Sequence, residues 1–489
     1  METPLDKGTP YADAVAANAA GDLLRLNVPG HSGDDSAAPE LTSFFGLGVL
    51  KKDISPLLEG VDLGSESPYD EALALAAEAW GARQTWFLTN GASQANRMGA
   101  LTFGAFGRPE QPILVQRSAH SSFIDGIILA GLTPVFMQPL IDDRYGIAHG
   151  VSPAELERML AETEEPKGVY VVTPSYFGAV ADVAAMAEIA HAAGVPLMVD
   201  EAWGAHFGFH PELPHNSLSL GADLVVSSTH KLGGSLTQSA MMHLGDGPFA
   251  DELGPLVQRA YMMTMSTSQS ALLLASLDIA RHALEVGQTQ MGEAIAAAER
   301  MRAEIRRRGR FKIVSDSWDF DEVVDSDPLR ISVDVRVAGL NGNAVRDELI
   351  RSYGIYTEIS TDSCIVAFLG PGFAPDVSRF VDALHRLQPA GTLAYADTVT
   401  LPLPHFGELS MRPRDAWFAP AVKVPAYEAV GRVSADSLAA YPPGIPNVMP
   451  GEAITIEVVD FLRTVAASPG GYVRGALDTA VDYIRVVAN

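Results

Sequence analysis

The chain has 489 residues, a length that predicts two or three domains rather than one simple core. Its 47% hydrophobic and 19% charged residues are typical of a soluble globular protein. A net charge of −26 argues against nucleic-acid binding, because phosphate contacts need a basic surface. Such an acidic surface would steer cationic substrates toward the protein, or it would serve solubility alone.

Signals for export, membrane insertion and disulfides are missing from the sequence pattern. Residues 1–27 show no basic segment followed by an apolar run, and no stretch reaches the roughly 18 apolar residues of a membrane span. The single cysteine, Cys364, excludes an intramolecular disulfide and fits a reducing compartment. We therefore expect a cytoplasmic protein without membrane contact, and we interpret Cys364 as a core residue.

Short apolar runs alternate with helical patterns between about residues 80 and 244. The clearest helices are expected at 93–106 and 183–193. The strand-like runs are 85–88, 112–115, 134–137, 168–172, 196–199, 224–226 and 240–242. Apolar, β-branched runs separated by helices predict an α/β fold with a mostly parallel sheet covered on both faces.

The pattern changes after residue 270. Residues 270–308 read as one long or broken helical region, and its final Arg306–Arg308 suits a helix C-terminus, which favours positive charge. Strands at 329–335 and 365–368, with helices at 343–352 and 376–387, predict a smaller α+β domain. We expect four parts: an N-terminal arm (1–75), a large domain (76–285), a small domain (286–392) and a C-terminal domain (393–489).

The most informative segment runs from Val225 to Lys231. An apolar strand leads into hydroxyl groups, an imidazole and one lysine, with Leu232-Gly233-Gly234 forming a turn beyond it. Burial at a strand end would lower the pKa of the lysine, and a lysine of this kind can form a Schiff base with an aldehyde cofactor. An ordinary surface lysine is the alternative that this segment alone does not exclude.

Other polar residues follow neighbouring strands. Asp200 ends the strand 196–199 and precedes Trp203, and Asn90-Gly91-Ala92-Ser93 links a strand to a helix whose N-terminus would bind an anion. His120 follows the strand 112–115. Ligands of parallel sheets gather outside the carboxyl ends of the strands. An anion cradle, an aspartate and a lysine match the phosphate, ring nitrogen and aldehyde of pyridoxal 5'-phosphate (PLP).

An ordered set of motifs identifies the chain as resembling the Orn/Lys/Arg decarboxylase family, fold type I PLP-dependent enzymes of the aspartate aminotransferase superfamily. The resemblance covers nearly the whole chain. It depends on Val28–His31, Asn90–Ser93, Thr173–Gly178, Asp200–Trp203, Ser228–Lys231, Ser266–Ser270, Leu272–Ser276 and the C-terminal signature, Gly431–Ser434 through Tyr441–Pro446 to Pro450–Glu452.

The resemblance implies a role for each matching residue. Lys231 would carry the cofactor and Asp200 would pair with its ring nitrogen, while His120 and Ala202 would cover the two faces of the ring. The remaining residues expected around the cofactor and its phosphate are Gly91, Ala92, Ser93, Trp203, Ser228, His230, Ser266 and Thr267. His230 or Lys231 would return a proton to the substrate. Ser266–Ser268 is the candidate contribution of a partner subunit, so we expect at least a homodimer.

Two departures from the family pattern stand out. Ala92 replaces a frequent second hydroxyl residue, so that this position offers the phosphate only its backbone. The extra N-terminal domain of the long enterobacterial members is missing, and their decameric assembly is therefore not assumed. The size resembles the short arginine decarboxylases, which makes arginine the first-choice substrate and lysine or ornithine the next.

Other functions remain open at this stage. Another fold type I PLP reaction, such as transamination or retro-aldol cleavage, would use the same scaffold. An aminotransferase would need an arginine in the small domain for the α-carboxylate; Arg330 is a candidate, although a decarboxylase could use it too. A non-enzymatic cofactor-binding protein is a further alternative. A dinucleotide-binding fold is disfavoured because no G-x-G-x-x-G follows the first strand. No metal site is expected: His206 and His210 are four positions apart, but the intervening Gly208 and the following Pro211 disfavour a helical pair of ligands.

Several further residues receive simple interpretations. Met262, Met263 and Met265 would either pack in the core or line a substrate channel, and we favour the core. The acidic positions Asp319, Asp321 and Glu322 are expected in a solvated loop. Asp415 and Glu428 are candidates for contact with the distal cation of a basic substrate.

Overall fold

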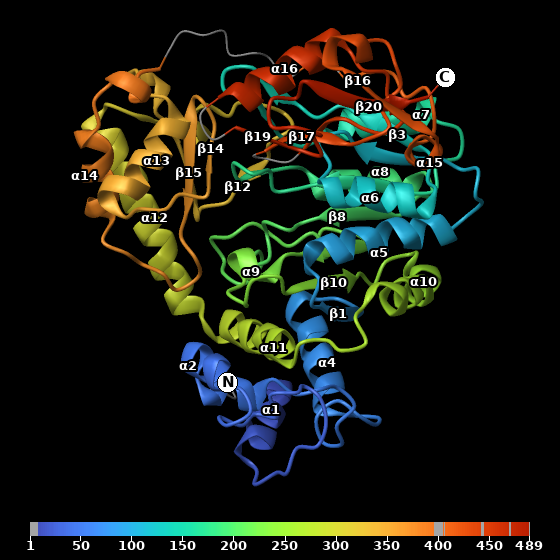
Figure 1. Ribbon diagram of the computed structural model, residues 1–489, viewed down its shortest axis with the longest axis vertical. Coiled ribbons are helices and arrows are strands. Elements are labelled where there is room, and N and C mark those ends of the chain that lie inside the picture. Colours follow the sequence, from blue (N-terminus) through green and yellow to red (C-terminus); the bar gives the residue numbers. More distant parts are fainter. Residues whose placement is uncertain (1–7, 396–403, 405, 442–444, 469–470, 489) are drawn as a thin grey trace.

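The computed structural model describes residues 8–395, 404, 406–441, 445–468 and 471–488. Residues 442–444 of the C-terminal signature therefore lie outside the described residues. Figure 1 shows the N-terminal arm below the main sheet, the small antiparallel sheet to one side and the C-terminal segment above.

Seven strands form the main sheet. In spatial order they are β1 (Gln84–Leu88), β10 (Ala240–Leu244), β9 (Leu224–Ser227), β8 (Leu197–Asp200), β6 (Val169–Val172), β2 (Ile113–Gln116) and β3 (Pro134–Met137). The pairs from β9 to β3 are parallel, whereas β10 runs antiparallel to both of its neighbours. The predicted α/β fold with a mostly parallel sheet is confirmed.

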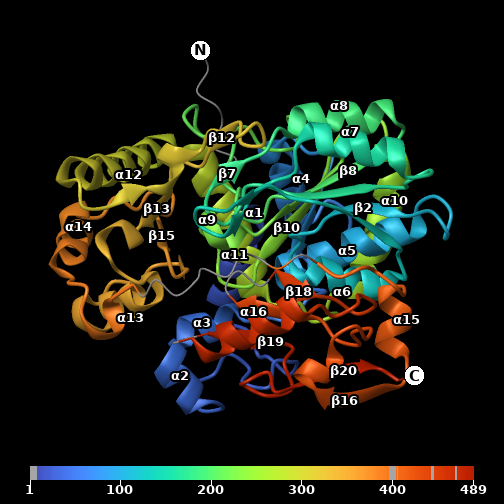
Figure 2. The ribbon, with the colours of Figure 1, turned by 90° about the horizontal axis from the view of Figure 1, so that it is seen from above.

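Both faces of this sheet are covered by helices (Figure 2). Side chains alternate along each strand, so Leu114 of β2 packs in one buried cluster and its neighbours Ile113 and Val115 pack in the other. The first cluster receives α4 (Pro68–Trp80), α7 (Pro153–Glu162), α8 (Val183–Ala192) and α11 (Ala271–Val286). The second receives α5 (Gly91–Ala105), α6 (Ser121–Ala130) and α10 (Ala250–Thr264).

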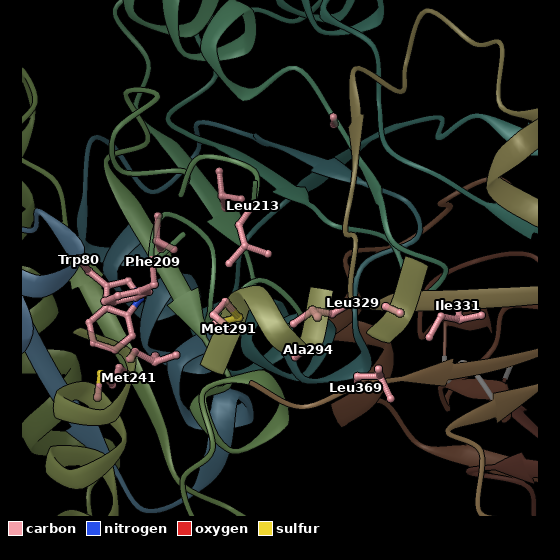
Figure 3. Close-up of a cluster of buried hydrophobic side chains, with 14 of the residues drawn as sticks. Trp80, Phe209, Leu213, Met241, Met291, Ala294, Leu329, Ile331 and Leu369 are labelled. Carbon is pink, nitrogen blue, oxygen red and sulfur yellow. The ribbon is translucent and has the colours of Figure 1, made fainter. Parts of the chain in front are cut away.

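The small sheet is antiparallel. Its strands, in spatial order, are β11 (Lys312–Ile313), β13 (Arg330–Asp334), β15 (Cys364–Phe368) and β14 (Ile359–Ser360). They accompany the helices α12 (Gln288–Arg308), α13 (Gly342–Tyr353) and α14 (Val377–Arg386). The expected helical region 270–308 is broken at Gly287, between α11 and α12. Figure 3 shows that Met291 and Ala294 of α12 continue the apolar core toward Leu329 and Ile331.

The N-terminal arm is tied to the body by a buried carboxylate. Helix α1 (Pro10–Ala20) packs against α4 and α11, and its first amides, Tyr11 and Ala12, donate to Asp278 Oδ2 of α11 at 3.0 and 3.3 Å. After α1 come α2 (Pro39–Phe45) and α3 (Leu47–Lys52). Large apolar side chains remain exposed along this arm, among them Leu24, Leu26, Phe44 and Leu57. Such a surface is typical of a protein–protein contact.

The C-terminal segment has a small core of its own. Its helices are α15 (Pro413–Phe418) and α16 (Ile456–Ala467), and its strands are β16 (Ala421–Pro425), β17 (Leu438–Tyr441), β18 (Pro446–Val448), β19 (Tyr472–Arg474) and β20 (Tyr483–Val487). It lies on the α6 side of the main sheet, where α15 contacts α6 and Met449 joins the second buried cluster. The shorter strands elsewhere are β4 (Ile141–Asp142) with β5 (Ile147–Ala148), and β7 (Ala179–Val180) with β12 (Asp325–Ser326).

The interpretations of individual side chains have mixed outcomes. Cys364 is fully buried, as expected. The prediction that Met262 and Met263 pack in the core is wrong: they are 61% and 66% exposed on α10. Only Met265 packs against the core. The arginines 306–308 make ion pairs with acidic side chains, which agrees with the helix-end interpretation.

The described part of the chain has neither a membrane-spanning helix nor a cluster of metal ligands. No helix there is long and apolar enough to cross a membrane. No group of three or more histidine, cysteine or acidic side chains is arranged to hold a metal ion within those residues. His206 instead contacts Asp327, with 3.1 Å between Nε2 and Oδ1.

Candidate active site

Four strands of the main sheet bring the predicted residues to one edge. β8 ends at Asp200, and β9 leads through Ser228 into a one-turn helix, α9 (Thr229–Leu232), which carries Lys231. β2 is followed by the loop that presents His120, and β1 by the glycine turn before α5. Because β1, β9, β8 and β2 point the same way, their carboxyl ends share this edge.

The amino group of Lys231 lies over an aromatic ring instead of an acidic partner. Its Nζ is 4.0 Å from the centre of the Trp203 indole. Burial is the main reason that the pKa of Lys231 falls to about 8, although Asp200 and Glu358 act in the opposite direction. About a tenth of this amine is therefore unprotonated at pH 7, far more than for a lysine of ordinary pKa, and this favours a nucleophilic role.

The carboxylate of Asp200 accepts three hydrogen bonds from its own chain. It is buried, and its Oδ2 accepts hydrogen bonds from Asn96 Nδ2 at 2.8 Å and from the Tyr170 hydroxyl at 2.9 Å. Its Oδ1 accepts the amide of Ala202 at 3.1 Å. Three hydrogen-bond donors therefore hold this carboxylate in one orientation. Such a carboxylate suits a cationic ligand atom.

His120 is linked to Asp200 through two polar side chains. Asn96 Nδ2 also donates to Ser122 Oγ at 3.0 Å, and Ser122 Oγ lies 2.8 Å from His120 Nδ1. The Ser122 amide donates to the same Nδ1 at 3.2 Å, so Nδ1 acts as an acceptor and the ring proton lies on Nε2. Burial lowers the pKa of His120 and favours this neutral form.

His230 has the opposite tautomer. Its Nδ1 lies 3.0 Å from the carbonyl oxygen of Ser239, which only accepts, so Nδ1 carries the proton. Ser228 Oγ lies 3.2 Å from the same nitrogen. Burial lowers the pKa of His230. In the neutral ring Nε2 has no proton to give, which makes Lys231 the better of the two expected proton donors.

The predicted anion cradle lies at the turn between β1 and α5. Gly91 begins α5 with a φ of 74°, a left-handed conformation that favours glycine. The N-cap residue Asn90 makes no side-chain hydrogen bond to the first turn of this 15-residue helix. The backbone amides of Ala92 and Ser93 and the Ser93 hydroxyl lie at the positive end of α5, and their binding of a phosphate stays a prediction.

Arg330 forms a further part of this region. Its guanidinium carbon is 4.1 Å from the centre of the Trp203 ring, and its Nη1 donates to the Tyr176 carbonyl at 3.0 Å. Its buried Nη2 has no hydrogen-bond partner in the described part of the chain. Gly178 of the Thr173–Gly178 motif leaves room for it, since a Cβ there would come within 2.9 Å of the Arg330 side chain.

Ser266 and Thr267 are not gathered with Lys231. Both are exposed in the loop between α10 and α11. The loop starts beside the cradle, because Gln94 Nε2 donates to Thr264 Oγ1 at 3.3 Å. Asp415 and Glu428 are also exposed, and Asp415 pairs with Arg412 at 2.8 Å. Contact of these two acidic residues with a substrate stays a prediction.

Sequence reasoning missed the supporting residues Asn96, Tyr170 and Ser122. A signal was present for two of them. Asn96 is a buried polar residue in the apolar face of α5, and Tyr170 places a hydroxyl inside a strand that is otherwise apolar. Such groups need a buried partner. Glu358 was missed because it reaches Lys231 only through the packing of the small sheet.

The comparisons with known proteins identify the class. Residues 9–366 match the model of the Orn/Lys/Arg decarboxylase major domain, and residues 402–471 match that of the C-terminal domain. The chain belongs to the Orn/Lys/Arg decarboxylase family, and the resemblance seen in the sequence is confirmed.

Individual relatives are similar over their whole length. The arginine decarboxylase of Bacillus subtilis is 34% identical over 98% of both chains, and that of Halalkalibacterium halodurans is 34% identical over 98% of this chain and 97% of the relative. Among solved structures, lysine decarboxylase A of Pseudomonas aeruginosa has a TM-score of 0.83 at 21% identity, covering 99% of this chain and 81% of the other. The last comparison concerns the fold alone.

Proposed function

We propose that the protein is a PLP-dependent decarboxylase of a basic amino acid that releases carbon dioxide and a polyamine-pathway amine. Arginine is the first choice and lysine or ornithine the next. The observation that carries the proposal is the joint position of Lys231 and Asp200 at adjacent strand ends, with the α5 cradle on the same edge. The whole-length similarity to proteins named arginine decarboxylase supports the choice of substrate.

The residues present fit PLP. When bound, this cofactor supplies an aldehyde for a lysine and a protonated ring that accepts the electrons left by departing carbon dioxide. Lys231 offers an amine with a lowered pKa, and Asp200 offers a buried carboxylate that accepts three hydrogen bonds. The first turn of α5 and Ser93 offer donors for a phosphate.

Each side chain around the cofactor site has a separate proposed role. With the cofactor bound, Asp200 would stabilise a positive charge on the ring nitrogen, and His120, whose pKa burial lowers, would contact the ring as a neutral imidazole. Lys231, over the Trp203 indole, returns the proton to the α-carbon, because neutral His230 uses its proton on Ser239. Arg330, with its free Nη2, orients the substrate by its carboxylate.

The direct test is product analysis with a panel of L-arginine, L-lysine and L-ornithine labelled in the carboxyl carbon. We expect one molecule of labelled carbon dioxide for each molecule of amine, fastest with arginine. Formation of a keto acid without carbon dioxide would instead identify an aminotransferase. No turnover of any of the three would contradict the proposal.

We further propose that two copies share their sites, as a homodimer in the cytoplasm. Three exposed features support a partner contact: the apolar arm with Leu24 and Phe44, the pair Met262 and Met263 on α10, and the loop Ser266–Ser268.

Two variants that are each expected to be inactive, Lys231→Ala and Thr267→Asp, test this shared site when they are co-expressed and purified together. If the loop serves the partner's site, mixed dimers regain one intact site and measurable activity; activity that stays absent would contradict sharing. We also propose the division of the chain into an N-terminal arm (1–75), a large domain (76–285), a small domain (286–392) and a C-terminal domain (393–489).

A further inference from the structure

The C-terminal signature ends at Glu452, far in sequence from the candidate site, yet its carboxylate is almost fully buried. Glu452 Oε2 lies 2.9 Å from Arg117 Nη2, and Oε1 lies 3.2 Å from Arg117 Nε. The exposed fractions of these side chains are 1% and 0%. A forked pair of this kind fixes the guanidinium in one orientation.

Arg117 has two further contacts with the C-terminal part of the chain. Its Nη1 donates to the carbonyl of Pro446 at 2.7 Å, and its guanidinium carbon is 3.7 Å from the centre of the Phe406 ring. The Arg117 amide donates to the Met137 carbonyl of β3 at 2.9 Å. Arg117 is therefore held by the main sheet on one side and by the C-terminal part on the other.

A second arginine acts on the other side of His120. Arg474, at the end of β19, donates from Nη1 to Ser121 Oγ at 2.6 Å. Ser121 begins α6, and His120 is the N-cap residue of that helix. The C-terminal part of the chain thus contacts Ser121, which follows His120, and Arg117, which lies three positions before His120.

We infer that the C-terminal domain positions His120 in the active site through two contacts, Glu452 with Arg117 and Arg474 with Ser121. These four are positioning residues, since the structure shows them acting through the loop 117–121 and not on a ligand. The inference rests on the proposed function only for the role of His120; the contacts themselves do not depend on it. By this inference, the C-terminal signature of the family acts indirectly in catalysis, because its Glu452 helps to position His120.

The test compares Arg474→Gln with two controls in the full-length protein. Arg474→Lys keeps a donor for Ser121. Arg463→Gln removes another arginine of the C-terminal segment, one that lies on α16 and pairs with Asp482. Hydrogen exchange, measured by mass spectrometry in the cofactor-free protein, reports the amides of residues 119–123. Three of them bond within the loop, including that of Ser122 to His120 Nδ1.

We expect Arg474→Gln to speed exchange at 119–123 about tenfold and to lower kcat about tenfold with little change in KM. The same variant should alter the visible circular dichroism of the PLP-loaded protein. Arg474→Lys should restore most of each effect, and Arg463→Gln should change none. Glu452→Gln should also speed exchange at residues 119–123. If the Glu452→Gln variant does not fold, the result for Arg474→Gln alone tests the inference.

Unchanged exchange in Arg474→Gln would overturn the inference, and so would faster exchange with unchanged kcat and circular dichroism. If the wild-type protein neither takes up PLP nor releases carbon dioxide, the proposed function fails instead. The exchange result would then still decide whether the two arginine contacts hold the loop.

Discussion

The surroundings of Asp200 and the loop Ser266–Ser268 differ in where their partners come from. Asp200 has three hydrogen-bond donors from its own chain, and the network extends through Asn96 and Ser122 to His120. The loop presents hydroxyl groups to solvent, next to an exposed methionine pair on α10. One side of the site is thus organised within a single fold, whereas the other has groups that a partner subunit would use.

The largest effect is expected from Lys231→Ala. Loss of the amine should lower kcat by more than about a thousandfold, because no other described group replaces it as carrier and proton donor. Visible absorption of bound PLP should also disappear. Absorption spectra and carbon dioxide release measure both effects, and full activity of this variant would contradict the lysine's role.

The Asp200 side is tested by Asn96→Ala. This change removes one donor to a buried carboxylate and separates Asp200 from Ser122. A hydrogen bond to a charged group contributes about 1.5–3 kcal/mol, which predicts a tenfold to hundredfold lower kcat. Gln258→Ala, which removes a hydrogen bond to Trp86 away from the site, is a control for the loss of a side-chain amide. Equal kinetics of the two variants would show that the network has no role in catalysis.

The pH dependence follows from Lys231. Its pKa is lowered to about 8, mainly by burial, and only the unprotonated amine attacks an aldehyde. The rate of PLP capture by the cofactor-free protein should therefore rise about tenfold from pH 7 to 9 and then level off. A model amine of ordinary pKa should continue to gain rate above pH 10. A protein rate that follows the model amine would contradict the lowered pKa.

The smallest effect is expected from Glu358→Gln. This carboxylate acts electrostatically on Lys231 from the small domain, next to β14, and it is exposed, so its negative charge is available to the distal cation of a basic substrate. We expect KM for arginine to rise about fivefold with kcat little changed, as measured by initial rates. Glu348→Gln on α13, whose side chain pairs with Arg351, is the matched control. An equal change in both variants would show only a general charge effect.

The sequence predicted those parts of the structure that depend on local pattern. Periodicity located the seven strands of the main sheet, and the residues after them, such as Asp200 and Lys231, were recognised because strand ends share an edge. Burial from distant segments was not visible. Asn96, Tyr170 and Glu452 join the site only through packing between segments far apart in the chain.

The wrong prediction for Met262 and Met263 has a related cause. A methionine-rich helical stretch looks the same in sequence whether a core or another subunit covers it. In the single chain these side chains lie on the exposed face of α10. The same limit applies to Ser266 and Thr267, whose proposed role requires a second chain.

The most direct measurement is to reduce the PLP-loaded protein with borohydride and locate the modified residue by peptide mass spectrometry. Reduction makes the link between cofactor and lysine permanent. Modification of Lys231 in close to one copy per chain, lost in Lys231→Ala, is the predicted result. Modification at another lysine, or none, would contradict the assignment of this strand end as the catalytic centre.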